Sequence, residues 1–184
     1  GGLPRYRACR PRCRVAYRRP APGVVGAMTY TLLIDGASGS GKTTLARQIG
    51  HALGIRVVHL DDFYPGWYGL AEGAAMVARD VLHPVQPGYW RWDWCRHRRA
   101  EWVPLEPGKD LVVEGVGAVT ESSIRAARML GDVNTIWVSA DEHTRKARAL
   151  ARDPGYVLWW QMWARQEAAL EKMPVDVEVM RRPG

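Results

Sequence analysis

Cysteine, phenylalanine and long hydrophobic runs are scarce in this sequence. Only three of its 184 residues are cysteine. This odd number does not describe a disulfide framework, so we expect a reducing, cytoplasmic compartment. No stretch contains the roughly 18 consecutive apolar residues that would span a bilayer, and residues 1–27 lack the apolar run of a secretory signal. These absences predict a soluble, cytoplasmic protein with no membrane partner.

Residues 1–27 also lack acidic side chains and serine. They contain seven arginines and four prolines without apolar periodicity, a composition that cannot bury enough surface to become ordered. We therefore expect a disordered basic leader over residues 1–27, followed by one globular domain over residues 28–184. Because the sequence begins with glycine and Met28 directly precedes the first predicted strand, we interpret the leader as an upstream extension.

The net positive charge of the sequence comes from this leader. The chain has 26 Lys and Arg residues against 19 Asp and Glu residues, a formal net charge of +7, and such a balance suggests a nucleic-acid partner. Seven of the 26 basic residues lie in the leader, which leaves 19 basic and 19 acidic residues from Met28 onward. We therefore expect a neutral domain without a nucleic-acid partner, and any nucleic-acid binding would depend on the leader alone.

After residue 28, short β-branched runs alternate with helical stretches, as in parallel α/β proteins. Strands are expected at 31–35, 56–60, 111–114, 134–139 and 175–179. The acidic residues of the last strand favour an edge position. Helices are expected at 42–53, 70–81, 121–130, 141–152 and 157–172. The segment 83–110, rich in Pro and Trp, is expected to be a loop.

Residues 36–43 read GASGSGKT and match the pattern G-x-x-x-x-G-K-[ST] between a predicted strand and a predicted helix. Glycines let successive backbone N–H groups surround a phosphate, and the helix adds the positive end of its dipole. Lys42 is expected to reach the β- and γ-phosphates, and the Thr43 hydroxyl to bind Mg²⁺. The predicted nucleotide-binding residues are Gly36, Ala37, Ser38, Gly39, Ser40, Gly41, Lys42, Thr43 and Thr44.

A phosphate-binding loop alone does not distinguish kinases from GTPases, transport ATPases or helicases. The sequence has no N-K-x-D guanine motif and no L-S-G-G-Q motif, and it is too short for a helicase core. Asp61 and Asp62 follow the second predicted strand, and Glu114 ends the third. These carboxylates are therefore expected at the carboxyl edge of the sheet, where open α/β folds bind their ligands.

Three arginines, Arg145, Arg148 and Arg152, are spaced three and four residues apart and share one face of a predicted helix. They can form a solvated face or contact phosphates. Aromatic residues crowd the segments between the second and third strands, namely Tyr64, Trp67, Tyr68, Tyr89, Trp90, Trp92 and Trp94. Their rings can line an acceptor pocket or form the core of a small domain, and the sequence favours neither.

Two further groups of residues are given structural roles. Trp159, Trp160 and Trp163 lie on one predicted helix at a spacing that favours packing in the core. The histidines from His59 to His143 have no metal-ligand spacing and are expected to be structural or surface residues.

Taken together, the motifs resemble the uridine kinase-like branch of the P-loop nucleoside kinases. The resemblance rests on IDGASGSGKTTLA (34–46), HLDDFYPGW (59–67), YWRWDW (89–94), VVEGVGA (112–118) and RKARALARD (145–153). These segments occur in the family's order. They imply an α/β P-loop NTPase three-layer sandwich with a central five-stranded parallel sheet and a short helical lid. The longer base-recognition hairpin of the nucleoside kinases is not evident.

The resemblance also implies roles for individual residues. Asp61 corresponds to the catalytic base that accepts the proton of the acceptor hydroxyl, and Asp62 stands where these kinases usually have Ser, which leaves either carboxylate as the base. Lys42, Arg148 and Arg152 would complete the catalytic set, the two arginines as part of the lid. Mg²⁺ would be held by Thr43, Asp62 and Glu114.

The sequence therefore predicts a kinase-like domain that uses ATP and Mg²⁺ to phosphorylate a hydroxyl of a small molecule. A nucleoside is the first candidate acceptor, and another metabolite is the alternative because the base-recognition hairpin is not evident. A non-catalytic or slowly hydrolysing ATP-binding module that regulates a partner is a further hypothesis. Tight nucleotide binding without ADP release in the presence of acceptors would favour that module.

Overall fold

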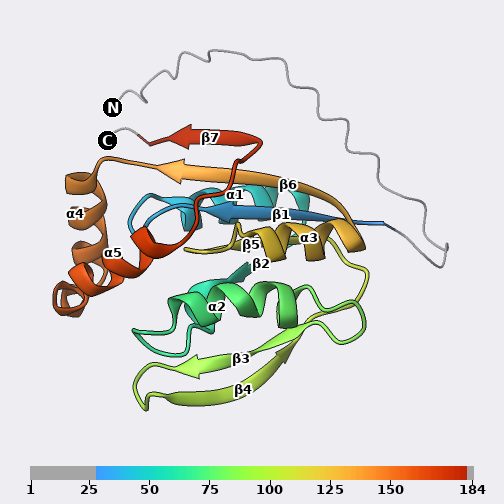
Figure 1. The fold of residues 1–184 in the computed structure, drawn as a ribbon, viewed down its shortest axis with the longest axis horizontal. Coiled ribbons are helices and arrows are strands. Elements are labelled where there is room, and N and C mark those ends of the chain that lie inside the picture. Colours follow the sequence, from blue (N-terminus) through green and yellow to red (C-terminus); the bar gives the residue numbers. More distant parts are fainter. Residues whose placement is uncertain (1–27, 182–184) are drawn as a thin grey trace, which may run out of the picture.

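The computed structural model describes residues 28–181, so the predicted basic leader lies outside the described residues. The described part is built on a five-stranded sheet with the order β2-β5-β1-β6-β7, in which all neighbouring strands are parallel (Figure 1). The strands are β1 (Thr29–Asp35), β2 (Arg56–His59), β5 (Leu111–Glu114), β6 (Gly131–Ser139) and β7 (Val177–Met180). The predicted five-stranded parallel sheet and the edge position of its last strand are confirmed.

Helices cover both faces of this sheet. Successive side chains of a strand point to opposite sides, so one strand packs against both layers. On one face, Leu32 and Ile34 of β1 pack with Ala46 of α1 (Lys42–Leu53). On the other face, Leu33 belongs to a larger apolar cluster with residues of α2 (Leu70–Met76), α3 (Glu121–Leu130) and α5 (Trp160–Ala169). The result is the predicted three-layer arrangement, with α1 behind the sheet in Figure 1 and α2, α3 and α5 in front.

Two helices, α3 and α4 (Glu142–Arg152), begin at polar caps. Thr120 accepts a hydrogen bond from the Ser123 backbone at the start of α3, and Asp141 accepts one from Thr144 at the start of α4. The last predicted helix, 157–172, is shorter than expected. A 3₁₀ turn at Pro154–Leu158 precedes α5, and Leu170 is already extended, so only residues 160–169 are α-helical.

The expectation of a loop over residues 83–110 is wrong. Strands β3 (Gly88–Asp93) and β4 (Arg98–Pro104) form an antiparallel hairpin, which lies below the main sheet in Figure 1. Trp90 and Trp102 face each other across it with ring centroids 5.6 Å apart. Such cross-strand pairs stabilise a ribbon whose residues show no simple apolar alternation. A hairpin therefore does lie between the second and third predicted strands, where no local pattern indicated one.

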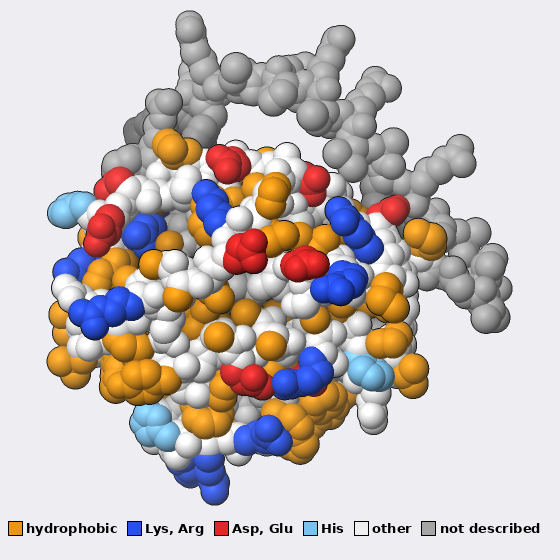
Figure 2. Space-filling model, viewed as in Figure 1, with side chains coloured by type: hydrophobic (Ala, Val, Ile, Leu, Met, Phe, Trp, Pro, Cys, Tyr) orange, Lys and Arg blue, Asp and Glu red, His pale blue; other side chains and the backbone are white. Residues whose placement is uncertain are grey.

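Charged side chains of both signs lie on the surface of the described domain. Figure 2 shows basic and acidic side chains interspersed over the face that it displays. Within residues 28–181, no helix has the length and apolar character needed to cross a bilayer.

Candidate functional site

The phosphate-binding loop joins β1 to α1 and adopts a conformation that requires glycine at two points. Gly36 has φ 144° and Gly39 has φ 78°. A Cβ on Gly36 would overlap the backbone carbonyl of Val138, and one on Gly39 would overlap the backbone of Arg145. The loop is therefore held tightly between the end of β6 and the helix α4.

Asp35 fixes the beginning of this loop. Its carboxylate accepts hydrogen bonds from the backbone N–H groups of Gly36 (2.6 Å), Gly117 (3.1 Å) and Val119 (2.9 Å). Burial raises the pKa of Asp35, and these three donors act in the opposite direction. All three partners are backbone groups, so Asp35 ties the loop to the segment after β5 and has a structural role.

Lys42, the first residue of α1, is 8% exposed. Burial acts to raise the pKa values of Asp61 and Glu114, and the charge of Lys42 acts in the opposite direction on both carboxylates. The structure thus groups one predicted phosphate-binding cation, Lys42, with the predicted catalytic base Asp61 and the predicted metal ligand Glu114, which come from three different parts of the chain. Such a grouping of opposite charges is suited to hold a polyphosphate and its metal ion.

Glu114 is paired with His59, a residue to which the sequence assigned no chemistry. The His59 Nδ1 lies 2.6 Å from Oε1 of Glu114, while the buried Oε2 has no hydrogen-bond partner. Burial opposes ionisation of Glu114, but the His59 hydrogen bond and the charge of Lys42 bring its pKa below the usual value. An ionised carboxylate therefore presents one free oxygen at this edge of the sheet.

This free oxygen fits the expected magnesium ion. Mg²⁺ prefers oxygen ligands, retains several waters and is commonly bound by one or two carboxylates together with substrate phosphates. The Oε2 of Glu114 and the hydroxyl of Thr43 would supply protein ligands of that kind. Within residues 28–181 no group of three or more His, Cys, Asp or Glu residues forms a metal site by itself, so the phosphates would have to complete the coordination.

We expect His59→Leu to destabilise the domain by about 1–3 kcal/mol, because Oε1 of the buried Glu114 carboxylate would then lose its hydrogen bond to His59. His59→Asn is the matched control, since the asparagine amide can donate from nearly the position of Nδ1. The free energy of unfolding, measured by denaturant titration, should fall in the leucine variant and recover in the asparagine variant. Equal stability of the two variants would contradict this role of His59.

Asp61 lies in a cavity of about 410 Å³. The cavity is lined by Asp61, Tyr64, Trp67, Trp94, His97, Arg152, Asp153, Tyr156, Trp159 and Trp163. Solvent reaches the Asp61 side chain through this opening, while the surrounding protein still desolvates the carboxylate and raises its pKa. A raised pKa moves a carboxylate toward the range in which a general base works well.

The other predicted catalytic residues are distributed unequally around this cavity. Arg152, at the end of α4, lines it together with Asp61. Arg148 is exposed on the same helix. Arg145 contacts the phosphate-binding loop, since its Nη1 donates to the carbonyl of Ser38 at 3.1 Å. Asp62 points toward the hairpin, where the Tyr89 hydroxyl donates to its Oδ2 at 3.4 Å.

Aromatic rings form most of the cavity wall. Trp67 stacks on Trp159, with ring centroids 5.2 Å apart and planes 6° apart, and on Tyr156 at 5.4 Å. Trp163 is buried in the core as expected, but it also lines the cavity, where its indole N–H has no partner. The assignment of Trp159 and Trp163 to core packing alone was therefore incomplete.

Two residues that the sequence analysis did not single out contact the loop directly. Glu167 of α5 accepts a hydrogen bond from the Ser38 backbone N–H at 2.8 Å. The Tyr156 hydroxyl donates to the Ser38 side chain at 3.0 Å. These partners lie 129 and 118 residues from Ser38 in the sequence, and no local pattern relates them to the motif.

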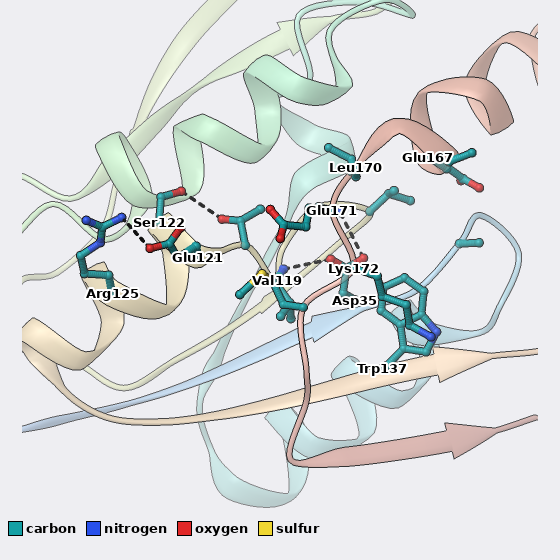
Figure 3. A pocket seen from close by; sticks show the side chains of 16 residues that line it. Asp35, Val119, Glu121, Ser122, Arg125, Trp137, Glu167, Leu170, Glu171 and Lys172 are labelled. Atoms are coloured by element: carbon teal, nitrogen blue, oxygen red, sulfur yellow. Dashed lines mark hydrogen bonds and ion pairs between the residues drawn. The ribbon is translucent and has the colours of Figure 1, made fainter.

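A larger cavity, of about 660 Å³, lies on the other side of the loop. Figure 3 shows its walls, formed by Asp35, the start of α3 and the segment that carries Leu170 and Lys172. Two of its charged groups pair with each other, Arg125 with Glu121 at 3.4 Å. None of the predicted catalytic residues lines it, so we assign the chemistry to the smaller cavity.

Comparison with known proteins identified several kinases. No protein-family model matches the chain. Shikimate kinase 2 from Yersinia pestis (strain Pestoides F) is 31% identical over 128 residues, which cover 69% of this chain and 66% of that protein. Shikimate kinase 2 from Yersinia pseudotuberculosis serotype O:3 (strain YPIII) is 30% identical over the same length. The chain thus spans just under two thirds of the length of these curated relatives.

Among solved structures, a protein assigned as a fructose transport system kinase from Silicibacter sp. TM1040 has a TM-score of 0.56 and 20% identity, covering 86% of this chain and 92% of that one. A protein assigned as a uridine kinase from Bacillus stearothermophilus has a TM-score of 0.50 and 19% identity, covering 85% and 91%. A gluconokinase from Sinorhizobium meliloti 1021 has a TM-score of 0.50 and 16% identity, covering 85% and 83%. The chain therefore has the α/β fold of the P-loop kinases.

Proposed function

We propose that this chain, which has the P-loop kinase fold, transfers the γ-phosphoryl group of ATP to a hydroxyl of a small molecule. The observation that carries the proposal is the position of Asp61. It lines the aromatic cavity and at the same time lies in the electrostatic field of Lys42, the lysine of the phosphate-binding loop. One carboxylate therefore lies between the place for phosphate and the place for an acceptor.

Each residue of the proposed site has a definite task. The loop N–H groups and Lys42 would bind the phosphates, and Asp61 would accept the proton as the acceptor hydroxyl attacks phosphorus. Arg152, on the wall of the same cavity, would stabilise the charge that develops on the transferred group. Mg²⁺, bound by Thr43 and Glu114, would neutralise phosphate charge.

The cavity indicates the kind of acceptor. Its volume of about 410 Å³ is in the range of small-molecule sites, and its stacked tryptophans suit a flat or ring-shaped ligand. We infer a ring-bearing alcohol, with nucleosides as the first candidate and cyclic metabolites such as shikimate as the alternative.

An acceptor screen tests this function. The full chain, supplied with ATP and Mg²⁺, is expected to release ADP at least about ten times faster with its true acceptor than with water alone, since positioning a nucleophile lowers the barrier substantially. Uridine, other nucleosides, shikimate and open-chain polyols would be compared in one coupled assay. ATP binding without acceptor-dependent ADP release from any ring-bearing alcohol would contradict the proposal and favour a regulatory nucleotide-binding module.

A further inference from the structure

We propose that Glu167 is a positioning residue of the nucleotide site: its carboxylate fixes Ser38 and thereby holds the phosphate-binding loop in the conformation that receives ATP. The inference rests on the proposed binding of ATP, and it concerns a residue outside the motif. Glu167 lies in α5 and is one of the residues that line the larger cavity shown in Figure 3.

Three groups form a closed set of contacts around the loop. The Ser38 N–H donates to Oε1 of Glu167 at 2.8 Å. The other oxygen, Oε2, lies 3.8 Å from Nη1 of Arg145, and the same Nη1 donates to the Ser38 carbonyl at 3.1 Å. The side chains of Glu167 and Arg145 are only 11% and 17% exposed. Solvent screening of this charged contact is therefore weak.

Every polar group of Ser38 is engaged by α4, by α5 or by the turn between them. Its N–H and carbonyl bind Glu167 and Arg145, and its hydroxyl accepts a hydrogen bond from Tyr156 at 3.0 Å. The next residue, Gly39, lies directly against the Arg145 backbone. Ser38 is thus the point at which the loop is fastened to the rest of the domain.

A glycine-rich loop needs such a fastening. Gly36, Gly39 and Gly41 all have positive φ, and glycine loses more conformational freedom on ordering than any other residue. If the loop were free, ATP would have to order it on binding, and that cost would reduce affinity. The hydrogen bond between Ser38 and Glu167 therefore preorganises the loop before the nucleotide binds.

A carboxylate suits this position better than a neutral acceptor. It accepts the Ser38 N–H and also balances the charge of Arg145, whose guanidinium lies over the ring of Trp160 with 5.7 Å to the centroid. Without that charge, Arg145 would lose the ion pair that it forms within residues 28–181. Arg145 therefore serves the loop through Glu167 and Ser38.

The test compares four proteins by calorimetric titration with ATP and Mg²⁺: the unmodified full chain, Glu167→Ala, Glu167→Gln and Glu171→Ala. Glu167→Ala should bind ATP about tenfold more weakly, as expected for the loss of a charge-assisted hydrogen bond that orders the loop. Glu167→Gln keeps an acceptor for Ser38 and should remain within about threefold of the unmodified chain. Glu171→Ala removes the same charge from an exposed site and should leave the affinity unchanged.

Hydrogen exchange supplies a second measurement that needs no nucleotide. The loop amides around Ser38 should exchange faster in Glu167→Ala than in the unmodified chain, and Glu167→Gln should restore their protection. If the alanine variant does not fold, Glu167→Asp takes its place, because its shorter side chain keeps the charge but draws the carboxylate away from Ser38.

The outcomes separate this inference from the proposed function. If the unmodified chain binds ATP and Glu167→Ala binds it equally or more tightly, Glu167 does not position the loop and only this inference fails. Equal weakening in the alanine and glutamine variants would also overturn it, because the hydrogen bond to Ser38 would then not be the cause. Failure of the unmodified chain to bind ATP would refute the proposed function and this inference together.

Discussion

Lys42→Ala is expected to weaken ATP binding by about 100-fold, equivalent to about 2.8 kcal/mol, because truncating one member of a desolvated charge pair costs several kcal/mol. Lys42 is 8% exposed and begins α1 directly after the glycine loop. An alanine there would leave the backbone N–H groups but remove the cation that reaches the outer phosphates. Titration with ATP and with ADP, each in the presence of Mg²⁺, measures the loss.

A matched control is needed because Lys42 also neutralises part of the charge on Asp61 and Glu114. Lys146→Ala removes the same charge from an exposed position on α4 and should bind ATP like the unmodified chain. Unfolding curves of both variants distinguish loss of affinity from loss of the fold. A folded Lys42→Ala protein with undiminished ATP affinity would show that the loop does not bind nucleotide in the proposed way.

The loop and its flanking elements could be predicted because their determinants are local. The motif is eight residues long, its glycines are needed where φ is positive, and the apolar runs at 31–35 and 111–114 are buried strands of the sheet. The helix bounds 42–53 and 121–130 were also predicted correctly. In each case the residues that determine the conformation lie within a few positions of one another.

The hairpin was missed because its stability depends on pairs across two strands. Tyr89 packs on Phe63, with ring centroids 5.0 Å apart, and Trp90 packs on Trp102. One partner of the first pair lies 26 residues away in the sequence, outside any window of local periodicity. The prolines and tryptophans of this segment are typical of a loop. Tertiary packing nevertheless stabilises it as two antiparallel strands.

The contacts that hold the phosphate-binding loop in place could not be predicted from the sequence at all. Glu167 and Ser38 are separated by 129 positions, and an isolated Glu on an amphipathic helix is most simply interpreted as a solvated residue. His59 was likewise treated as structural, although its hydrogen bond leaves one oxygen of Glu114 free. Glu167 acts on the site through Ser38, and His59 acts through Glu114. A motif search finds Ser38 and Glu114 but not the residues that hold them.

The helix α5 links the two halves of the proposed site. Glu167 binds the phosphate-binding loop, and the preceding residue, Gln166, donates to the carbonyl of Trp67 at 2.8 Å on the cavity side. One turn earlier, Trp163 forms part of the cavity wall. A movement of α5 would therefore displace both the phosphate-binding loop and the cavity wall, because both contact this helix.

Asp61→Asn is expected to lower the rate of phosphoryl transfer by about 10²–10⁴-fold, the usual contribution of a general base. The amide keeps the size of the side chain but cannot accept the hydroxyl proton. ATP affinity should stay within about threefold, because the change removes a like charge near the phosphates and leaves Lys42 and the loop N–H groups in place. Single-turnover kinetics with the acceptor found by the screen, together with an ATP titration, separates the two effects.

Asp62→Asn is the control that decides between the two neighbouring carboxylates. Asp62 faces Tyr89 of the hairpin, whereas Asp61 lines the cavity with Arg152. Proton transfer requires the base within hydrogen-bonding reach of the acceptor hydroxyl, so Asp62→Asn should retain most of the transfer rate. A large loss in Asp62→Asn combined with full activity in Asp61→Asn would assign the base to Asp62. The acceptor would then have to lie against the hairpin, between Tyr89 and the end of β2.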